Sequence, residues 1–228
     1  QRLFLNGNVI QRMLPDVLIV AGRNTLIYTV GSFVIGLILA LFLALMRLSD
    51  IGPYRFFAMG YIELFRGLPA LITIILFGFG LPIAFDGFRI PGGRLVTGSL
   101  ALGIVAAAYM AETIRAGIQA VPRGQTEAAR SLGMSAPRAM ASIILPQAFR
   151  IIIPPLTNEF VLLIKDTSLL FVLGTTPAIR ELTNFARTTM TATRNPTPLT
   201  IVALVYLLIT LPLTWLVRRL EVRTAKAR

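Results

Sequence analysis

Long runs without a charged side chain alternate with short polar segments along this chain. Four of these runs have, or come close to, the roughly 17–25 residues that a helix needs to cross a bilayer. They cover residues 24–46, 67–85, 95–111 and 195–217. The pattern therefore predicts an all-α membrane protein in which each run belongs to a spanning helix.

A fifth apolar segment, from Ile151 to Phe171, is equally long but contains Glu159, Lys165 and Asp166. Ionisable side chains are costly in hydrocarbon, so those within spans usually face a bundle interior or a water-filled path. We therefore predict five transmembrane helices in one domain over residues 1–228, with residues 1–23 as an interfacial segment. The expected spans are about 24–48, 56–81, 95–114, 149–171 and 197–217, and the longest connection is about 115–148.

Composition agrees with a membrane protein and narrows its chemistry. Of the 228 residues, 55% are hydrophobic and 14% are charged, with a mean hydropathy of +0.76; a soluble domain carries about 25% charged residues. The chain has no Cys and no His, which removes thiolate nucleophiles, imidazole bases and the usual zinc ligands. We predict no catalytic residues, no metal site and no enzyme activity in this chain.

Neither of the two lysines, Lys165 and Lys226, follows a Gly-x-x-x-x-Gly segment. The sequence thus lacks the loop with which P-loop ATPases cradle phosphates. If ATP drives this protein, we expect ATP and Mg²⁺ to be bound by a partner ATPase, with no cofactor in this chain.

The net charge of +12 is explained by arginines at helix ends, where they meet anionic lipid, and does not indicate nucleic-acid binding. Lys and Arg also set orientation, because cytoplasmic loops carry an excess of them. One side of the predicted topology, which includes residues 112–150 and 218–228, holds twelve of them, and the other side holds eight. We expect the N-terminus outside and the C-terminus in the cytoplasm.

The polar segment 115–148 has the punctuation of two short helices. Pro122 suits a first helical turn, and Gly133 is a typical residue beyond a helix C-terminus. Ser135 can cap a second helix, with Pro137 in its first turn. The segment predicts a helix–Gly–helix elbow outside the membrane, although a surface hairpin that merely connects two spans fits the same residues.

A spaced motif in this elbow resembles the EAA loop of permease subunits in ABC importers. It consists of Glu127-Ala128-Ala129, then Gly133 and, after nine intervening residues, Ile143-x-Leu145-Pro146. Other segments resemble the branch that imports polar amino acids, the histidine and glutamine permease type. They are Tyr61 to Pro69, Ala111 to Gly117, Asn158-Glu159 and Lys165 to Leu169. The resemblance covers the chain from about Asn24 to Leu220 and implies the type I importer fold, with a cytoplasmic coupling loop.

This resemblance implies a division of labour among several chains. A second permease subunit, identical or paralogous, would complete the pathway, and two cytoplasmic ATP-binding cassette ATPases would power it. An extracytoplasmic binding protein would deliver the amino acid. The protein would lie in the bacterial cytoplasmic membrane, in contact with lipid. The residues implied to couple to the ATPases are Glu127, Ala128, Ala129, Arg130 and Gly133.

The fourth span carries the candidate substrate pathway. Glu159 and Asp166 lie seven positions apart, close to two turns of an α-helix, and therefore share one face. We expect them to attract the ammonium of an amino acid or a cationic side chain, and two acids against one lysine favour cationic substrates. In the alternative, a structural network, Lys165 neutralises Asp166. Hydrogen bonds to the substrate would come from Asn158, Thr167 and Ser168.

In the second span, Glu63 and Arg66 are three residues apart and are expected to form an ion pair on one helical face. In the alternative interpretation, Arg66 lines the pathway and meets the substrate carboxylate, while Gly67 and Pro69 bend the helix beside a cavity. Two other classes of protein stay open, a secondary transporter or channel subunit and a membrane enzyme.

Overall fold

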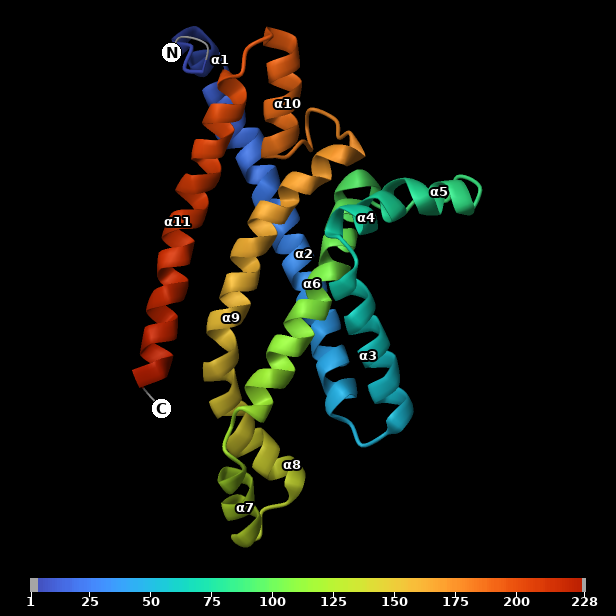
Figure 1. Cartoon of the computed structure of the whole chain (residues 1–228), viewed down its shortest axis with the longest axis vertical. Helices are drawn as coiled ribbons and strands as arrows, with labels where there is room; N and C mark the ends of the chain where they lie inside the picture. Colours follow the sequence, from blue (N-terminus) through green and yellow to red (C-terminus); the bar gives the residue numbers. More distant parts are fainter. Residues whose placement is uncertain (1–3, 227–228) are drawn as a thin grey trace.

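The protein is built from helices joined by short loops (Figure 1), and the computed structural model describes residues 4–226. These residues contain no β-strand. Four helical stretches are long and apolar enough to cross a membrane, and there are five crossings if the bent pair Gly52–Gly67 and Ala70–Ala84 is one span. The predicted all-α membrane fold is confirmed.

The first span is longer than expected from the sequence. One helical stretch runs from Gly7 to Leu48 and comprises α1 (Gly7–Asp16), the π-helical segment η1 (Val17–Gly22) and α2 (Arg23–Leu48). The helix therefore does not begin near Asn24, because residues 7–23 continue it toward the N-terminus. Asn24 does not cap a helix, because its Nδ2 donates hydrogen bonds to the carbonyl oxygens of Ala178 (2.9 Å) and Arg180 (3.1 Å).

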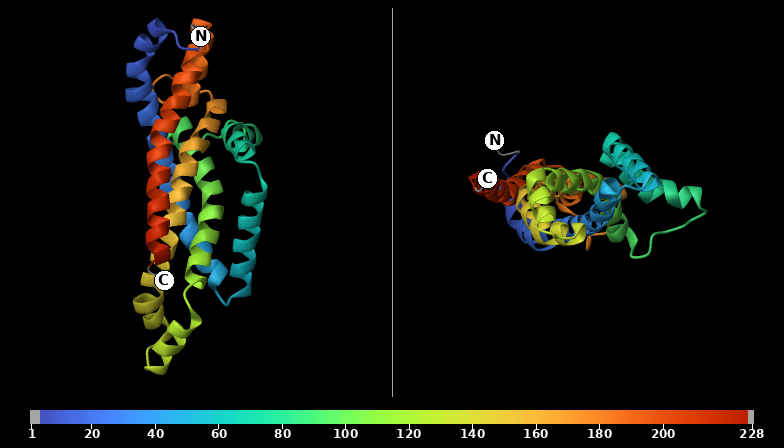
Figure 2. Two further views of the ribbon diagram at one scale, coloured as in Figure 1. Left: turned by 60° about the vertical axis from the view of Figure 1, so that its left-hand side comes forward. Right: turned by 90° about the horizontal axis from the view of Figure 1, so that it is seen from below.

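The second span is broken in the middle. After α3 (Gly52–Gly67), a second helical stretch comprises α4 (Ala70–Ile75), η2 (Leu76–Gly80) and α5 (Leu81–Ala84). The two stretches meet at 102°. Pro69 lacks a backbone N–H and keeps Leu68 extended, with φ −88° and ψ 136°, so the helix does not continue through this position. Seen from below, the second stretch projects from the bundle as an arm (Figure 2).

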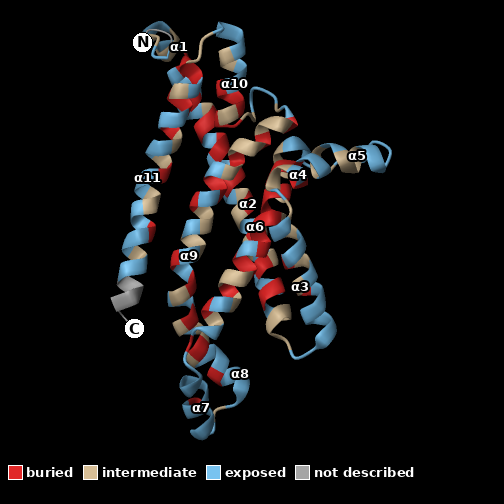
Figure 3. Ribbon diagram, in the orientation of Figure 1, coloured by how far each residue is buried: buried red, intermediate tan, exposed pale blue. Residues whose placement is uncertain are grey.

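The central helix of the bundle is α6 (Gly93–Gln119), which packs along α2 and also contacts α3, α4 and α9 (Leu145–Asp166). Small residues permit this close approach. A Cβ placed on Gly36 of α2 would lie 3.1 Å from the carbonyl oxygen of Gly103 in α6. Buried residues gather along these central helices, whereas much of the outer surface is exposed (Figure 3).

The predicted elbow lies at one end of the bundle and extends beyond it (Figure 1). Its first helix is α7 (Arg123–Ser131), for which Pro122 is the N-cap residue. Its second helix is α8 (Ala136–Ala139), which we expected to be separate from the fourth span. The structure differs, because α8 continues through η3 (Met140–Ile144), α9 and η4 (Thr167–Leu173). One helical stretch therefore runs from Ala136 to Leu173.

The remaining helices are α10 (Leu182–Thr193) and α11 (Thr197–Lys226). They form a second apolar core with α1 and η1, in which Met13, Val17 and Phe185 are buried. This core is at the end of the bundle opposite the elbow (Figure 1). Residues 1–3 and 227–228, and with them the ends on which the predicted orientation partly rests, lie outside the described residues.

Candidate functional site

A cavity of about 500 Å³ lies where three parts of the chain meet: the break between α3 and α4, the middle of α6 and the second half of α9. Its charged lining residues are Arg66, Glu159 and Asp166, and Tyr109 adds a ring and a hydroxyl group. Leucine, valine and alanine side chains supply most of the remaining wall. The break at Pro69 therefore borders a cavity, as the alternative interpretation of this segment predicted.

The side chain of Arg66 contacts a residue of α6 rather than a residue of its own helix, α3. Its guanidinium carbon lies 5.6 Å from the centre of the Tyr109 ring, within the range of a cation–π contact. The Tyr109 hydroxyl reaches the carbonyl oxygen of Arg66 at 3.5 Å. The expected ion pair with Glu63 is wrong: the two ion pairs among the described residues involve other side chains. Helical spacing brought Glu63 within reach, but the ring from another helix offers Arg66 a different contact.

The two carboxyl groups of α9 share one face, as their spacing predicted. Glu159 and Asp166 are both half-buried and both line the cavity. No hydrogen bond or ion pair joins either group to another described residue. Lys165 is exposed and forms no ion pair with Asp166 within the described chain.

Four of the predicted pathway residues lie outside the cavity lining. Asn158 and Lys165 are exposed on another side of α9, and Ser168 is half-buried. Thr167 is fully buried, and its hydroxyl donates a hydrogen bond of 2.6 Å to the carbonyl oxygen of Ile164. Successive residues of a helix point about 100° apart, so neighbours of Glu159 and Asp166 in sequence are not neighbours in the cavity.

The elbow has the geometry that its glycine predicted. Gly133 has φ +80°, a left-handed conformation that favours glycine. The N–H of Met134 donates to the carbonyl oxygen of Ala129 (3.1 Å), and the N–H of Gly133 donates to that of Arg130 (3.0 Å). These two bonds form a Schellman motif. The Arg130 guanidinium also donates to the carbonyl oxygen of Met134 (2.9 Å), so Arg130 helps to hold the turn.

The surface of the elbow differs from the predicted one at two residues. Glu127 and Ala128 are exposed, but Ala129 is 5% exposed and packs inside the elbow. Leu132, which the sequence argument did not single out, is 85% exposed. It lies outside every candidate span, so contact with lipid does not account for its exposure. A large apolar residue in the otherwise polar elbow, directly before the capping glycine, is the sequence signal that could have identified it.

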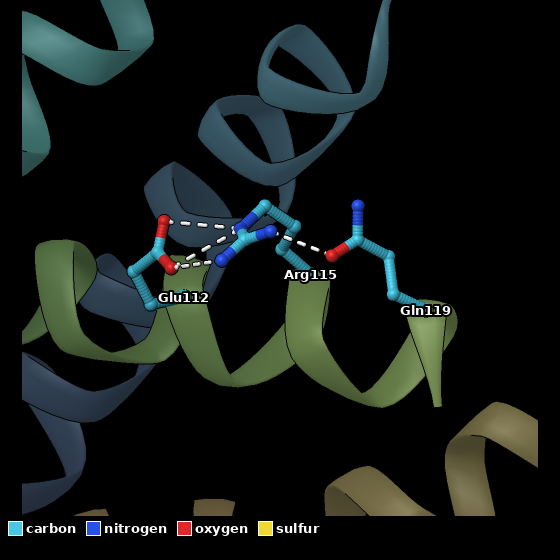
Figure 4. Close-up of polar contacts among 3 residues, drawn as sticks. All are labelled: Glu112, Arg115 and Gln119. Atoms are coloured by element: carbon cyan, nitrogen blue, oxygen red, sulfur yellow. Dashed lines mark hydrogen bonds and ion pairs between the residues drawn. The ribbon is translucent and has the colours of Figure 1, made fainter. Parts of the chain in front are cut away.

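Three polar side chains near the C-terminal end of α6, Glu112, Arg115 and Gln119, contact one another (Figure 4). Arg115 donates to both carboxylate oxygens of Glu112, with a shortest distance of 2.7 Å, and to the side chain of Gln119 at 2.6 Å. The sequence argument assigned these residues no role, although their three- and four-residue spacing fits one helical face. No group of three or more potential metal-binding side chains occurs within residues 4–226.

Comparison with known proteins places the chain in a family. Residues 32–226 match the family described as binding-protein-dependent transport system inner membrane component. The chain belongs to this family. Membership favours an ABC transporter permease over the secondary transporter, channel and membrane enzyme.

Individual members of the binding-protein-dependent permease family cover nearly the whole chain. The probable glutamine ABC transporter permease GlnM of Bacillus subtilis (strain 168) is 40% identical over 197 residues, which is 86% of each chain. The glutamate/aspartate import permease GltK of Escherichia coli O157:H7 is 38% identical over 209 residues, or 88% of this chain and 90% of its own. A crystal structure of an amino acid ABC transporter with histidines matches with a TM-score of 0.85 and 36% identity, covering 96% of this chain and 99% of that one.

Proposed function

We propose that this permease is the membrane-spanning subunit of an ATP-driven importer of polar amino acids. Its family, and the amino acids in the names of the similar permeases, support this assignment. The observation that carries it is the cavity of about 500 Å³ with charges of both signs. A free α-amino acid is a zwitterion, so a pathway for it needs a cation for the carboxylate and an anion for the ammonium.

Three side chains would bind the two charged groups of the amino acid. Arg66 would donate to its carboxylate, because a guanidinium matches the two oxygens of a carboxylate. Glu159 and Asp166 would accept from its ammonium, or from a cationic side chain. Both carboxyl groups lack hydrogen-bond partners among the described residues. Because acids outnumber the arginine in the lining, amino acids with an additional positive charge would be preferred.

The partner chains supply the parts that this chain lacks. A second permease subunit, identical or paralogous, would cover the open side of the cavity. Two cytoplasmic ATPases would bind ATP and Mg²⁺, and an extracytoplasmic protein would deliver the substrate. In this arrangement the N-terminus lies outside and the elbow lies in the cytoplasm.

The elbow would transmit movement between ATPases and cavity. Glu127, Ala128 and Leu132 would contact a groove of the ATPase, since their side chains are exposed. Arg130 and Gly133 would keep the turn rigid through the bonds of the Schellman motif. The helical stretch from Ala136 to Leu173 joins the elbow to Glu159 and Asp166, so a rotation of the elbow would move two cavity residues directly.

Uptake by the reconstituted complex tests the assignment. The permease, its partner subunits and the binding protein are assembled in proteoliposomes, and uptake of a panel of labelled amino acids is measured with and without internal ATP. We expect ATP-dependent uptake of polar amino acids, with Lys or Arg foremost. Uptake at the same rate with and without ATP, or failure to transport any of the amino acids, would contradict the proposal.

Docking of the ATPases is tested separately with a matched pair of variants. Gly133→Val places a β-branched residue at φ +80°, whereas Gly124→Val places the same side chain in α7, where a Cβ meets nothing within 4 Å. We expect the first variant to lose co-purifying ATPase while its membrane insertion stays normal. The second should retain the ATPase. Equal retention in the two variants would remove the elbow from the coupling mechanism.

A further inference from the structure

A second cavity, of about 210 Å³, opens between α1 and α10. It lies at the end of the bundle opposite the elbow (Figure 1) and shares no lining residue with the larger cavity. Its charged lining residues are Arg12, Asp16 and Arg180. Two guanidinium groups therefore face one carboxylate, the reverse of the balance in the larger cavity.

Arg180 has unused hydrogen-bond donors in this second cavity. Its guanidinium carbon lies 4.3 Å from the centre of the Phe185 ring, and its Nη2 is 3.8 Å from a carboxylate oxygen of Asp16. The second distance is too long for a hydrogen bond. The Nε of Arg180 is buried and has no hydrogen-bond partner in the described chain. The guanidinium therefore keeps N–H donors available for an anionic oxygen, which arginine binds through charge-assisted hydrogen bonds.

The position of the cavity relative to the membrane indicates the source of that oxygen. The backbone N–H of Asn6 donates to the hydroxyl of Thr197 (3.0 Å), which joins the start of the first helical stretch to the start of α11. The residues that line the cavity include Asn8, close to the start of the first helical stretch, and Thr193, close to the start of α11. Two spans thus begin beside it, and arginines at the ends of spans reach the level of lipid headgroups.

One exposed apolar residue follows the cavity on the same side of the helix. Ile19 is 67% exposed and lies three positions beyond Asp16, in η1 and within the stretch that is apolar enough to span a membrane. Leu14 and Leu18 are also exposed, but they point about 200° around the helix from Asp16. A ligand with an anionic head and hydrocarbon chains would contact the charged cavity and Ile19 together.

We propose that the α1–α10 cavity binds the headgroup of a phospholipid that carries a phosphate and a primary ammonium, as phosphatidylethanolamine does. The phosphate accepts hydrogen bonds from Arg180 and Arg12. The ammonium donates to Asp16, whose side chain is 60% exposed. The acyl chains extend along the same helical stretch and contact Ile19.

The carboxylate of Asp16 selects this headgroup over two other common ones. Phosphatidylglycerol has no ammonium group that could donate to Asp16. Phosphatidylcholine carries a quaternary ammonium, which has no N–H to donate. A free amino acid carries both required charges, but it has no acyl chains to contact Ile19.

The test compares the full transporter complex in two kinds of nanodisc, one of phosphatidylethanolamine with phosphatidylglycerol and one in which phosphatidylcholine replaces the phosphatidylethanolamine. Thermal unfolding and native mass spectrometry measure stabilisation and retained lipid. For the wild type we expect a higher Tm with phosphatidylethanolamine and retention of that lipid. Arg180→Gln and Asp16→Asn should each lower the affinity of the permease for phosphatidylethanolamine about tenfold and abolish the difference in Tm between the two nanodiscs.

Matched controls separate a binding site from a general effect of charge or bilayer. Arg89→Gln removes one exposed arginine from the loop between α5 and α6 and should keep the lipid-dependent Tm difference. If Arg180→Gln lowers Tm equally in both nanodiscs, the variant has destabilised the fold rather than removed a lipid contact. The result for Asp16→Asn then decides whether the cavity binds the lipid, because this variant leaves the contact between Arg180 and Phe185 in place.

Three results would overturn the proposal. The first is a wild-type Tm difference that persists in Asp16→Asn. The second is equal retention of phosphatidylcholine and phosphatidylethanolamine. The third is stabilisation by a free amino acid in phosphatidylcholine nanodiscs that Arg180→Gln abolishes, which would assign the cavity to a soluble zwitterion.

Discussion

The two polar cavities of this permease contain the same kinds of charged group in opposite proportion. The larger one has Arg66 with two carboxyl groups, and the smaller one has Arg12 and Arg180 with one. The larger cavity lies at a broken helix, where backbone and side chains from three elements meet. The smaller one lies between α1 and α10, where two spans begin. The balance of positive and negative side chains in a cavity, and the elements around it, distinguish a pathway for solutes from a site for lipid. The mere presence of charged side chains does not.

The largest effect is expected from removing the acidic excess of the larger cavity. In the double variant Glu159→Gln, Asp166→Asn, we expect uptake of cationic amino acids to fall roughly a hundredfold, because each hydrogen bond to a charged group contributes about 1.5–3 kcal/mol. ATPase association should be unchanged. Initial uptake rates in proteoliposomes measure the effect. Asp86→Asn, an exposed carboxyl-to-amide change outside both cavities, is the control, and equal rates in double variant and wild type would refute the assignment.

A packing variant should disturb the larger cavity and spare the smaller one. A Cβ on Gly117 of α6 would lie 2.2 Å from Cγ1 of Ile152 in α9, and these two helices form opposite walls of the larger cavity. We expect Gly117→Ala to destabilise the permease by about 1–3 kcal/mol and to lower its Tm. Gly60→Ala is the control, since a Cβ there meets nothing within 4 Å. A Tm for Gly117→Ala at or above that of the wild type would show that the helices separate without cost.

A smaller effect is expected when the cation of the larger cavity is kept but its shape is changed. Arg66→Lys retains the charge and loses both the planar fork and the contact with the Tyr109 ring. We expect KM for uptake to rise several-fold, in keeping with the ~0.5–1 kcal/mol of an exposed cation–π contact. Tyr109→Leu should give a similar change and Tyr109→Phe a much smaller one. If Phe and Leu at this position behave alike, the ring does not position Arg66.

The smallest effect concerns a buried acid next to Arg180. Glu181 caps α10 by accepting from the backbone N–H of Asn184 (2.6 Å), and its carboxyl group faces the hydroxyl of Tyr206 at 3.5 Å. Burial raises the pKa of Glu181 from its usual 4.5 to about 7. The folded state therefore binds this proton more tightly than the unfolded state, and the free energy of unfolding should fall as pH rises from about 4.5 to about 7.

Thermal unfolding across this pH range measures the contribution of Glu181. Glu181→Gln keeps one accepting oxygen and cannot ionise, so the slope of Tm against pH should be shallower than in the wild type. Asp50→Asn, at an exposed position between α2 and α3, is the control and should keep the wild-type slope. An unchanged slope in Glu181→Gln would show that this acid is ionised at no cost in the folded protein.

Features that depend on residues close in sequence were predictable. Uncharged runs located the spans, and the seven-residue spacing of Glu159 and Asp166 placed them on one face. Gly133 predicted the cap of the elbow, because a left-handed residue after a helix favours glycine. The same rules failed where a distant segment offered a better partner. Asn24 was expected to open a helix, and it bonds carbonyl groups more than 150 positions away.

The sequence by itself determined that this chain crosses a membrane as helices, where most of them lie, and where an elbow interrupts them, because hydropathy, proline and glycine act locally. Only the tertiary structure decided which charged side chains share a cavity. It placed Arg66 against Tyr109 and Arg180 against Phe185, and it left Lys165 outside the cavity that Asp166 lines. The direction of a side chain within a helix follows from spacing, but its partner depends on which other helix packs there.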